Sequence, residues 1–311
     1  MYFPYLRGRQ FELVAIRELI ERSLISKNVI PVIEPVKITS ALLKTMETFR
    51  NKDCVLGLVR NPRVGSFRKD LANEKYKEER KRYYEILESP NIVSFLYADS
   101  NLSSNLSTLE HQGKSKLDIA TICSDLDSIQ YLKSIYTSET PRFNFIREAS
   151  VFRNRLPEKR VLFEDRFPKK NRNVEYMYPD DEPFSSDHLY FIQDGYLGFS
   201  DYSVVGDDYY ETGFAPYAIA IHIVYFAHDS TLRVRHFVSD TNDDITDPAG
   251  KFAEALEKLI KWNQIQGLDT YGIQFFEDLY RNGSYPGLGM VKKLSIMHHL
   301  ELMSRYLDGV I

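Results

Sequence analysis

Eight short apolar runs, rich in β-branched and aromatic residues, recur along the chain, and segments of helical periodicity separate many of them. The runs are Tyr2–Leu6, Val29–Glu34, Val55–Arg60, Ile92–Ala98, Asp118–Ser124, Arg142–Arg147, Arg160–Asp165 and Leu197–Val205. Most lack in/out alternation, as expected of strands that a parallel sheet buries on both faces. Strands and helices in this number predict an α/β fold, a TIM-type (β/α)8 barrel.

An open, doubly wound sheet is the alternative fold. Such sheets often carry a glycine-rich phosphate loop directly after the first strand. Residues 6–10 read Leu-Arg-Gly-Arg-Gln and lack the GxGxxG spacing, which favours the barrel.

Several helices of the barrel have recognisable start signals. Thr39 or Ser40 can cap a helix over residues 40–50, and Asp125 can cap another, because short polar side chains accept hydrogen bonds from the first turn. Residues 70–87 are highly charged, and we expect one continuous helix there.

Regularity ends after Asp165. Residues 167–187 are polar and contain three prolines, which predicts an irregular long loop at the barrel mouth, before the last strand. A short helix over residues 185–193 follows it.

The remaining chain predicts an elaboration of the barrel. Residues 217–226 and 232–238 resemble the two arms of a β-hairpin. Asp247-Pro248 begins a helix that Gly267 ends, and residues 291–307 predict a final amphipathic helix. We therefore expect a barrel over residues 1–214, with a hairpin and helices over residues 215–311 packed on it.

Charge and composition narrow the function classes. Residues 1–172 hold 31 Lys and Arg against 22 Asp and Glu, whereas residues 173–311 hold 9 against 22. The basic part can attract a phosphate-bearing ligand, although much of its excess lies in the charged segment 68–82, where solvated side chains explain it equally well. No apolar stretch is long enough to span a membrane, and two cysteines fit a reducing compartment, so we expect a cytoplasmic protein.

The ends of the expected strands are unusually charged. Barrel ligands bind at the carboxyl ends of the strands, so these side chains are the candidate site. They are Arg7, Glu34, Arg60, Arg147, Glu164, Asp165 and Asp201, with Asp99, Asp125 and Glu148 nearby.

Two interpretations of these residues are open. In the first, Glu34, Glu164, Asp165 and Asp201 form an oxygen-rich Mg²⁺ or Mn²⁺ site, Arg7, Arg60 and Arg147 clamp a phosphate, and the protein hydrolyses phosphoesters. In that enzyme Glu34, Glu164 and Asp201 are catalytic, while Asp165 and the arginines bind ligand. In the second, the same groups form structural ion pairs, and which of Glu164 and Asp165 faces the mouth stays undecided.

Other candidate residues carry weaker signals. His222 and His236 can face each other across the hairpin, but no HxH or HExxH zinc motif occurs. Cys123 ends an apolar strand and is interpreted as core. Tyrosines are frequent between residues 176 and 226, which is typical of either a protein contact surface or ordinary packing.

Three blocks of the sequence resemble the bacterial beta family proteins. They are MYFPYLRGRQFELVAIRELIE, VIPVIEPVK, and GFSDYSVVG followed by YAIAIHIVYF. The resemblance implies a barrel that binds a ligand and acts with a protein partner, expected to be a nuclease in a phage-defence module. It marks Arg7, Gly8, Glu34 and Asp201 as the positions that matter. An anion-binding partner protein is thus the first functional hypothesis, and a metal-dependent phosphodiesterase or related hydrolase is the alternative.

Overall fold

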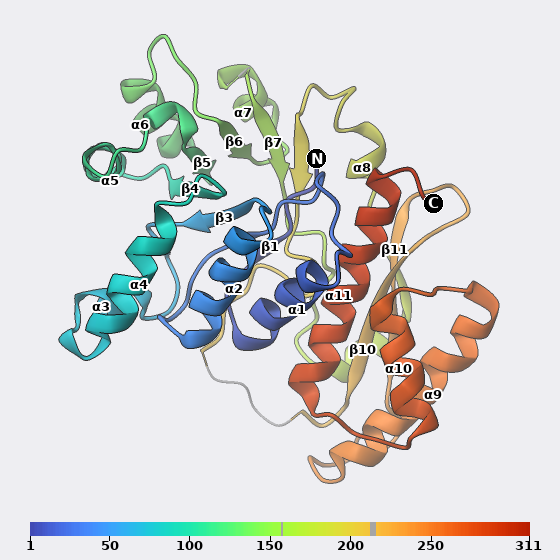
Figure 1. Ribbon diagram of the computed structural model, residues 1–311. Coiled ribbons are helices and arrows are strands. Elements are labelled where there is room, and N and C mark those ends of the chain that lie inside the picture. The colour runs from blue at the N-terminus through green and yellow to red at the C-terminus, as the bar shows by residue number, and fades with distance from the viewer. Residues whose placement is uncertain (157, 212–215) are drawn as a thin grey trace. The chain divides into compact units, whose positions relative to one another are not determined.

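Eight parallel strands form one sheet whose spatial order follows the chain (Figure 1). They are β1 (Tyr5–Leu6), β2 (Val32–Ile33), β3 (Leu56–Val59), β4 (Ile92–Tyr97), β5 (Ala120–Cys123), β6 (Phe143–Ile146), β7 (Arg160–Phe163) and β9 (Gly198–Ser200). Each lies within one of the eight predicted runs. This computed structural model describes residues 1–156, 158–211 and 216–311.

Hydrogen bonds between the first and last strands bring the sheet round into a barrel. Tyr2 forms parallel bridges to both Val29 and Phe199. The Phe3 N–H donates to the Phe199 carbonyl at 2.8 Å, and the Phe199 N–H donates to the Met1 carbonyl at 3.0 Å. The predicted (β/α)8 barrel is therefore confirmed.

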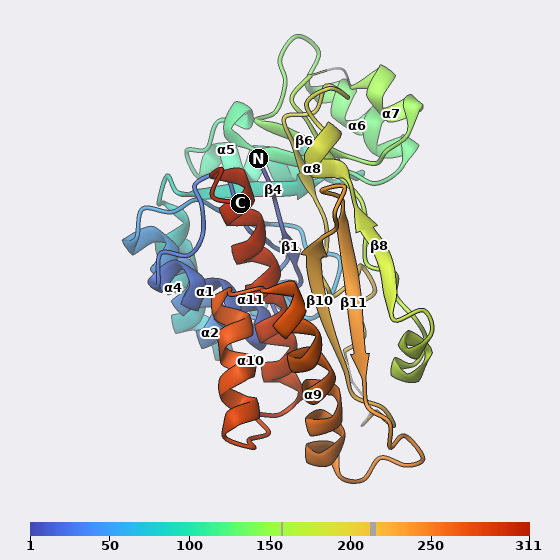
Figure 2. The same ribbon diagram turned by 90° about the vertical axis from the view of Figure 1, so that its right-hand side faces the viewer.

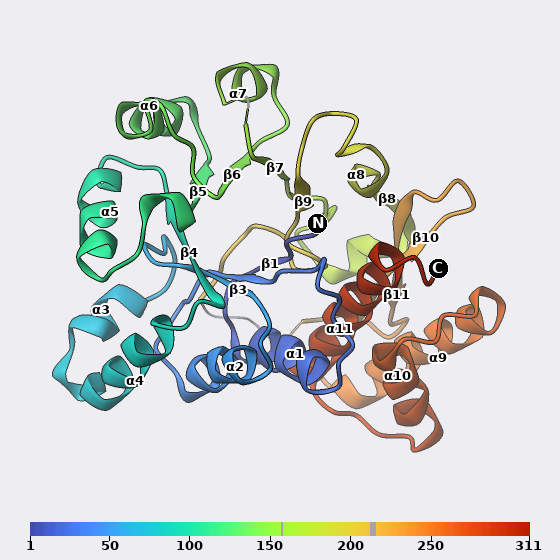
Figure 3. The same cartoon turned by 45° about the horizontal axis from the view of Figure 1, so that its top comes forward.

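Helices alternate with these strands, and Figure 3 shows α2 to α7 outside the ring of strands. Their bounds are α1 (Gln10–Glu21), α2 (Ser40–Asn51), α3 (Phe67–Ala72), α4 (Lys77–Leu87), α5 (Leu102–His111), α6 (Leu126–Ile135), α7 (Ser150–Arg155) and α8 (Asp187–Tyr190), with short 3-10 turns η1 (Glu74–Tyr76) and η2 (Lys116–Asp118). Thr39 caps α2, and Asp125 forms a reciprocal capping box with Ser128 at α6. Both predicted caps are confirmed.

The single helix expected over residues 70–87 is wrong. Asn73 has an extended backbone, and its side chain accepts a hydrogen bond from the Lys75 N–H. This local bond ends α3 and begins η1, so the charged segment forms two helices joined by a turn.

Aromatic rings fill the inside of the barrel. Phe145 is fully buried and its ring lies 5.2 Å from that of Phe3, 5.0 Å from Phe95 and 5.8 Å from Phe163. Edge-to-face contacts of this kind add to the stabilisation from burial. The centre of the barrel is thus a packed core and not an open pore.

A second sheet is antiparallel and has the order β10-β11-β8 (Figure 2). Its strands are β10 (Ala220–Phe226), β11 (Leu232–Val238) and β8 (Asp181–Ser185), and it is accompanied by η3 (Asn173–Met177), α9 (Pro248–Gln266), α10 (Tyr271–Arg281) and α11 (Leu288–Leu307). The predicted hairpin and the helix starting at Asp247-Pro248 are confirmed.

Two expectations for this part of the chain need correction, and one helix was not predicted. Residues 167–187 are not a structureless loop, because they contain η3 and β8. Pro183 is tolerated in β8 because that strand lies at the edge of the sheet. Helix α10 has no counterpart in the sequence prediction, and α11 is buried on most of its surface between Val291 and Ser304 rather than amphipathic.

Two compact units result, each discontinuous in sequence. The barrel unit comprises Met1–Leu13, Lys27–Asp165 and Asp187–Asp201, and the second unit comprises Val14–Ser26, Arg166–Ser186 and Tyr202–Ile311. The division at residue 214 stays a prediction. Among the described residues, no helix has the length and apolar character that crossing a bilayer requires.

Candidate functional site

The carboxylate of Glu34 is the centre of a hydrogen-bonded cluster at the carboxyl ends of the first barrel strands. Glu34 follows β2 and is fully buried. Its Oε2 lies 3.0 Å from the Tyr5 hydroxyl and 3.3 Å from the Tyr97 hydroxyl, and it forms an ion pair with the guanidinium of Arg7. The second carboxylate oxygen, Oε1, accepts a 2.7 Å hydrogen bond from the backbone N–H of Arg63. These five residues are called the Glu34 cluster below.

The bonding of Glu34 favours a positioning role over the expected catalytic one. A buried carboxylate is costly unless donors or a cation satisfy it. Here both oxygens have donors, and the carboxylate has no exposed surface. Glu34 therefore fixes Arg7 and the loop that carries Arg63.

Arg63 is the exposed residue of the Glu34 cluster, whose other four residues are buried. It lies 4.0 Å from the centre of the Tyr97 ring, and its Nη1 donates to the Ser124 hydroxyl at 2.9 Å. Within the described part of the chain, no carboxylate pairs with it, and its other N–H groups have no acceptor. A cation held in this way over an aromatic face is oriented before any ligand arrives.

Two residues of the loop after β3 place Arg63. The Asn61 side-chain amide donates to the Tyr97 carbonyl at 3.1 Å and accepts from the Tyr97 N–H at 2.9 Å, which ties the loop to β4. Gly65 has φ +73°, and a Cβ there would lie 2.2 Å from the Val36 carbonyl oxygen. The loop thus follows a path that a larger residue at position 65 would obstruct.

Sequence reasoning missed Arg63, because this residue lies in the loop beyond Arg60, the end of the predicted strand. The signal that could have found it is the Asn61-Pro62 pair, which marks a tight turn directly after an apolar strand. Such a turn reverses the chain, so a basic residue within it lies over the carboxyl ends of the strands.

Arg7 reaches Glu34 through a turn at Gly8. Gly8 has φ +64°, and a Cβ there would approach Ile33 Cγ2 at 3.0 Å and the Glu34 carbonyl oxygen at 3.2 Å. Arg7 and Glu34, two of the predicted site residues, are therefore brought together, and the Arg7 side chain is 10% exposed.

The tyrosines of this region are hydrogen-bond donors. Burial, followed by the negative charge of Glu34, raises the pKa of Tyr97 to about 12. Burial and Asp201 likewise hold the pKa of Tyr2 well above its usual value. Both hydroxyls therefore stay protonated at neutral pH.

Asp201 occupies the carboxyl end of β9 and is 2% exposed. Its Oδ1 accepts a 2.8 Å hydrogen bond from the Tyr2 hydroxyl, and its carbonyl accepts from the Tyr5 N–H at 2.8 Å. These contacts hold the end of β9 against Tyr2 and Tyr5, near the amino terminus. Asp201 is thus bonded to Tyr2, whereas Glu34 is bonded to Tyr5 and Tyr97.

Arg147, Glu164 and Asp165 follow β6 and β7. Glu164 is half-buried and its Oε1 accepts from the Glu148 N–H at 2.7 Å, which joins these two strand ends. Asp165 is also half-buried, and the question of which acid faces the mouth stays open. Arg147 is exposed and has no ion pair with any described residue.

Arg60 is bonded away from the Glu34 cluster. Its guanidinium donates to the Ser94 hydroxyl at 3.2 Å and to the Gln112 side chain at 3.3 Å, and it lies 5.9 Å from the Tyr83 ring. Arg60, Tyr83 and Gln112 line a hollow of about 130 Å³ between β4 and helices α4 and α5. The structure therefore does not bring Arg60 together with Arg7 and Glu34.

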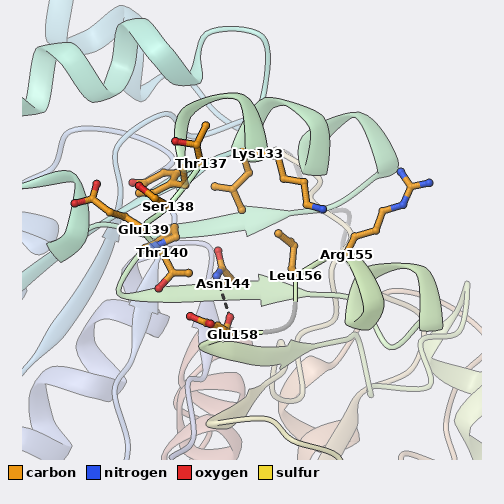
Figure 4. A pocket seen from close by; sticks show the side chains of 12 residues that line it. Lys133, Thr137, Ser138, Glu139, Thr140, Asn144, Arg155, Leu156 and Glu158 are labelled. Atoms are coloured by element: carbon orange, nitrogen blue, oxygen red, sulfur yellow. Dashed lines mark hydrogen bonds between the residues drawn. The ribbon is translucent and has the colours of Figure 1, made fainter.

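A second hollow, of about 240 Å³, lies by the amino end of β6 (Figure 4). Loop residues 137–140 border one end, and Lys133 and Arg155 lie at the other. The Asn144 amide inside it donates to the Glu158 carbonyl at 3.1 Å. None of the expected site residues lines this hollow, and the amino-terminal face of a barrel usually serves stability.

Candidate metal ligands do not converge among the residues that the structure describes. The residues described contain no group of three or more His, Cys, Asp or Glu side chains placed to hold a metal ion. Burial raises the pKa of the Cys123 thiol to about 12, which fits its interpretation as core. His222 and His236 do face each other across the hairpin, as the pattern indicated.

Comparisons with known proteins give no further information on this site. The chain matches no protein-family model, no curated protein and no solved structure, so the resemblance to beta family proteins stays an expectation.

Proposed function

We propose that the carboxyl-end face of the barrel binds a small anionic, phosphate-bearing ligand, with Arg63 as the main contact and Arg7 and Arg147 in support. One observation carries the proposal. The Arg63 guanidinium is held over the Tyr97 ring and bonded to Ser124, while its remaining N–H groups face no acceptor among the described residues. A planar guanidinium with free donors matches the oxygens of a phosphate.

The charges around this face support the same ligand class. Arg147 is exposed at the end of β6 and has no ion pair among the described residues. The basic excess of residues 1–172 adds a favourable long-range field for an anion. Ligand binding at strand carboxyl ends is also the rule for this fold.

Catalysis has less support than binding. Glu34 is buried and bonded on both oxygens, Asp201 is buried against Tyr2, and Glu164 accepts from a backbone N–H. A metal-dependent phosphodiesterase needs carboxylates that converge on Mg²⁺ or Mn²⁺. No such convergence occurs among the described residues, so no observation favours that alternative.

We further propose that the protein acts with a protein partner, for which the family resemblance implies a nuclease of a phage-defence module. Exposed aromatic side chains in the second unit support a contact surface. Tyr178 is 87% exposed, Tyr210 65% and Tyr217 59%. Large amphipathic rings of this kind are enriched where proteins meet.

Calorimetric titration with inorganic phosphate and pyrophosphate tests the ligand proposal. Arg63→Gln removes the guanidinium but keeps the backbone N–H that bonds Glu34, and we expect the affinity to fall at least tenfold, as for a lost charge-assisted hydrogen bond. Arg142→Gln is the matched control, since Arg142 is an exposed arginine at the opposite end of β6 from Arg147. Equal affinities for wild type and Arg63→Gln, or no binding by either, would contradict the proposal.

Co-expression with the candidate nuclease tests the partner proposal separately. We expect the two proteins to co-purify, or the nuclease activity to change on mixing. A chain that stays monomeric and leaves the nuclease unaffected would refute a partner role and leave the phosphate titration unchanged.

A further inference from the structure

Two histidines of the second sheet are bonded to each other. His222 of β10 pairs in register with His236 of β11, and their Nδ1 atoms lie 2.8 Å apart. His236 is 2% exposed and His222 is half-buried. Neither residue belongs to the barrel face described above, so the proposed ligand site does not account for this pair.

The hydrogen-bond pattern assigns the proton on each ring. His236 Nε2 lies 3.3 Å from Glu182 Oε2, and a carboxylate accepts, so this nitrogen carries the hydrogen. A neutral His236 then has its lone pair on Nδ1. The hydrogen between the two rings must therefore belong to Nδ1 of His222.

A segment of chain, Phe167–Met177, covers the pair. The Tyr176 ring centre lies 4.6 Å from the centres of both imidazole rings, and the Phe167 ring lies 5.1 Å from His222. Lys170 from the same segment bonds Glu182 Oε1 at 2.8 Å. The segment thus packs its aromatic rings over the histidines and ties itself to their carboxylate neighbour.

Charges on all sides act on these rings. Glu182 and Asp181 of β8 favour a proton on His236, whereas Lys170 of the covering segment opposes it. Burial lowers the pKa of His236 despite the two acids. For His222, burial, then His236 and Lys292 of α11, hold the pKa well below 6.5. Both rings are therefore neutral at neutral pH.

We propose that the His222–His236 pair is a proton-sensitive latch that releases the segment Phe167–Met177 from β10 and β11 on acidification. This goes beyond the proposed ligand site and does not depend on it.

The latch follows from the number of protons the pair can hold. One added proton can be accommodated on His236 Nδ1 if the hydrogen of His222 moves from Nδ1 to Nε2, because His222 Nδ1 then accepts. A second proton leaves two N–H groups facing each other 2.8 Å apart, with two cations beneath the rings of Tyr176 and Phe167. Opening the segment to water relieves this repulsion and hydrates both charges.

The sign of the pH effect follows from linkage. When the segment is open, His222 and His236 titrate near the ordinary value of about 6.5, and when it covers them their pKa values are lower. Below pH 6.5 the open form binds more protons, so the covered form is lost as the pH falls. Each histidine changes the opening equilibrium by up to about tenfold per pH unit.

Amide hydrogen exchange of the full chain at pH 7.5 and 5.5, corrected for intrinsic exchange rates, tests the latch. In wild type we expect residues 167–177 to lose protection by about tenfold or more at the lower pH. His222→Asn/His236→Asn should remove this dependence, while His228→Asn, in the exposed hairpin turn, should retain it. A wild type without the loss, or a double variant with the same loss, would overturn the proposal.

Nitrogen NMR of the histidine rings gives a second test on the wild type alone, which holds even if the double variant fails to fold. At pH 7.5 we expect His222 to carry its hydrogen on Nδ1 and His236 on Nε2. Rings that are charged at that pH, or that both carry hydrogen on Nε2, would also overturn the proposal.

Discussion

The backbone N–H of Arg63 donates a 2.7 Å hydrogen bond to Oε1 of Glu34. This bond joins the loop after β3 to the residue after β2. The position of the exposed residue Arg63 therefore depends on the carboxylate of Glu34, which is fully buried. The relationship separates the two roles that strand-end charges can have. Glu34 holds the loop in place, and Arg63 is the residue that we propose donates to a ligand.

Glu34→Gln should destabilise the barrel by about 3–5 kcal/mol, because it leaves the largely buried Arg7 guanidinium without its anionic partner. Urea unfolding followed by far-UV circular dichroism measures this. Glu85→Gln is the control, since Glu85 is exposed and forms an i,i+4 pair with Lys81, and it should change stability by less than about 0.5 kcal/mol. Equal effects of the two substitutions would show that the Arg7–Glu34 pair has no structural role.

Gly65→Ala should cost more stability than Gly113→Ala. Both glycines have positive φ, +73° and +79°, so each substitution carries the backbone penalty of about 1–2 kcal/mol. At Gly65 the new Cβ would also lie 2.2 Å from the Val36 carbonyl, whereas at Gly113 it meets nothing within 4 Å. Paired denaturation curves, with phosphate titrations of both variants, measure the difference. We expect phosphate binding to weaken in Gly65→Ala but not in Gly113→Ala. Equal denaturation curves for the two variants would show that the loop has room for a Cβ at position 65.

The strands were predictable from sequence because most are apolar on both faces, as the buried run around Leu58 illustrates. The same property concealed the directions of the side chains at strand ends. With no alternation to read, Arg60 could be assigned to the mouth, although it bonds Ser94 and Gln112 beside the helices. Where alternation exists, in the hairpin, the facing of His222 and His236 was predictable.

Local side-chain hydrogen bonds and edge strands explain why the helix over residues 70–87 was predicted wrongly and why strand β8 was not predicted. The Asn73 side chain bonds the Lys75 N–H and interrupts an otherwise helical pattern, an effect that periodicity cannot register. Strand β8 is polar, contains Pro183 and is stabilised by pairing with β11, about fifty residues away in sequence. Such long-range pairing leaves no signal in the segment itself.

Phe145→Ala should destabilise the barrel by about 3–5 kcal/mol, because it removes a fully buried ring that contacts Phe3, Phe95 and Phe163. Phe145→Leu keeps most of the volume and should cost clearly less. Thermal or urea unfolding compares them. Tyr84→Ala, at a 41% exposed position, is the control and should cost less than about 1 kcal/mol. A small effect of Phe145→Ala would mean that the barrel interior is not closely packed.

The second unit should lose stability as the pH falls from 6.5 towards 4 because of His298. Its Nδ1 is bonded to the Thr270 hydroxyl at 2.7 Å and its Nε2 to the Val224 carbonyl at 2.6 Å, and burial lowers its pKa to about 4. An unfolded histidine binds its proton near pH 6.5, so between these values the unfolded state holds more protons and folding weakens, by roughly 3 kcal/mol in total.

Urea unfolding at pH 7.5, 6.0 and 4.5, read at the Trp262 fluorescence, measures this loss. His298→Gln should lower stability at pH 7.5 but reduce the further decline on acidification, because glutamine can donate to the Val224 carbonyl and does not titrate. His228→Gln, in the exposed turn, should leave the decline unchanged. A His298→Gln protein with the full wild-type decline would show that other groups cause it. The latch at His222 and His236 is distinguished by its local exchange signal in residues 167–177, which His298→Gln should leave intact.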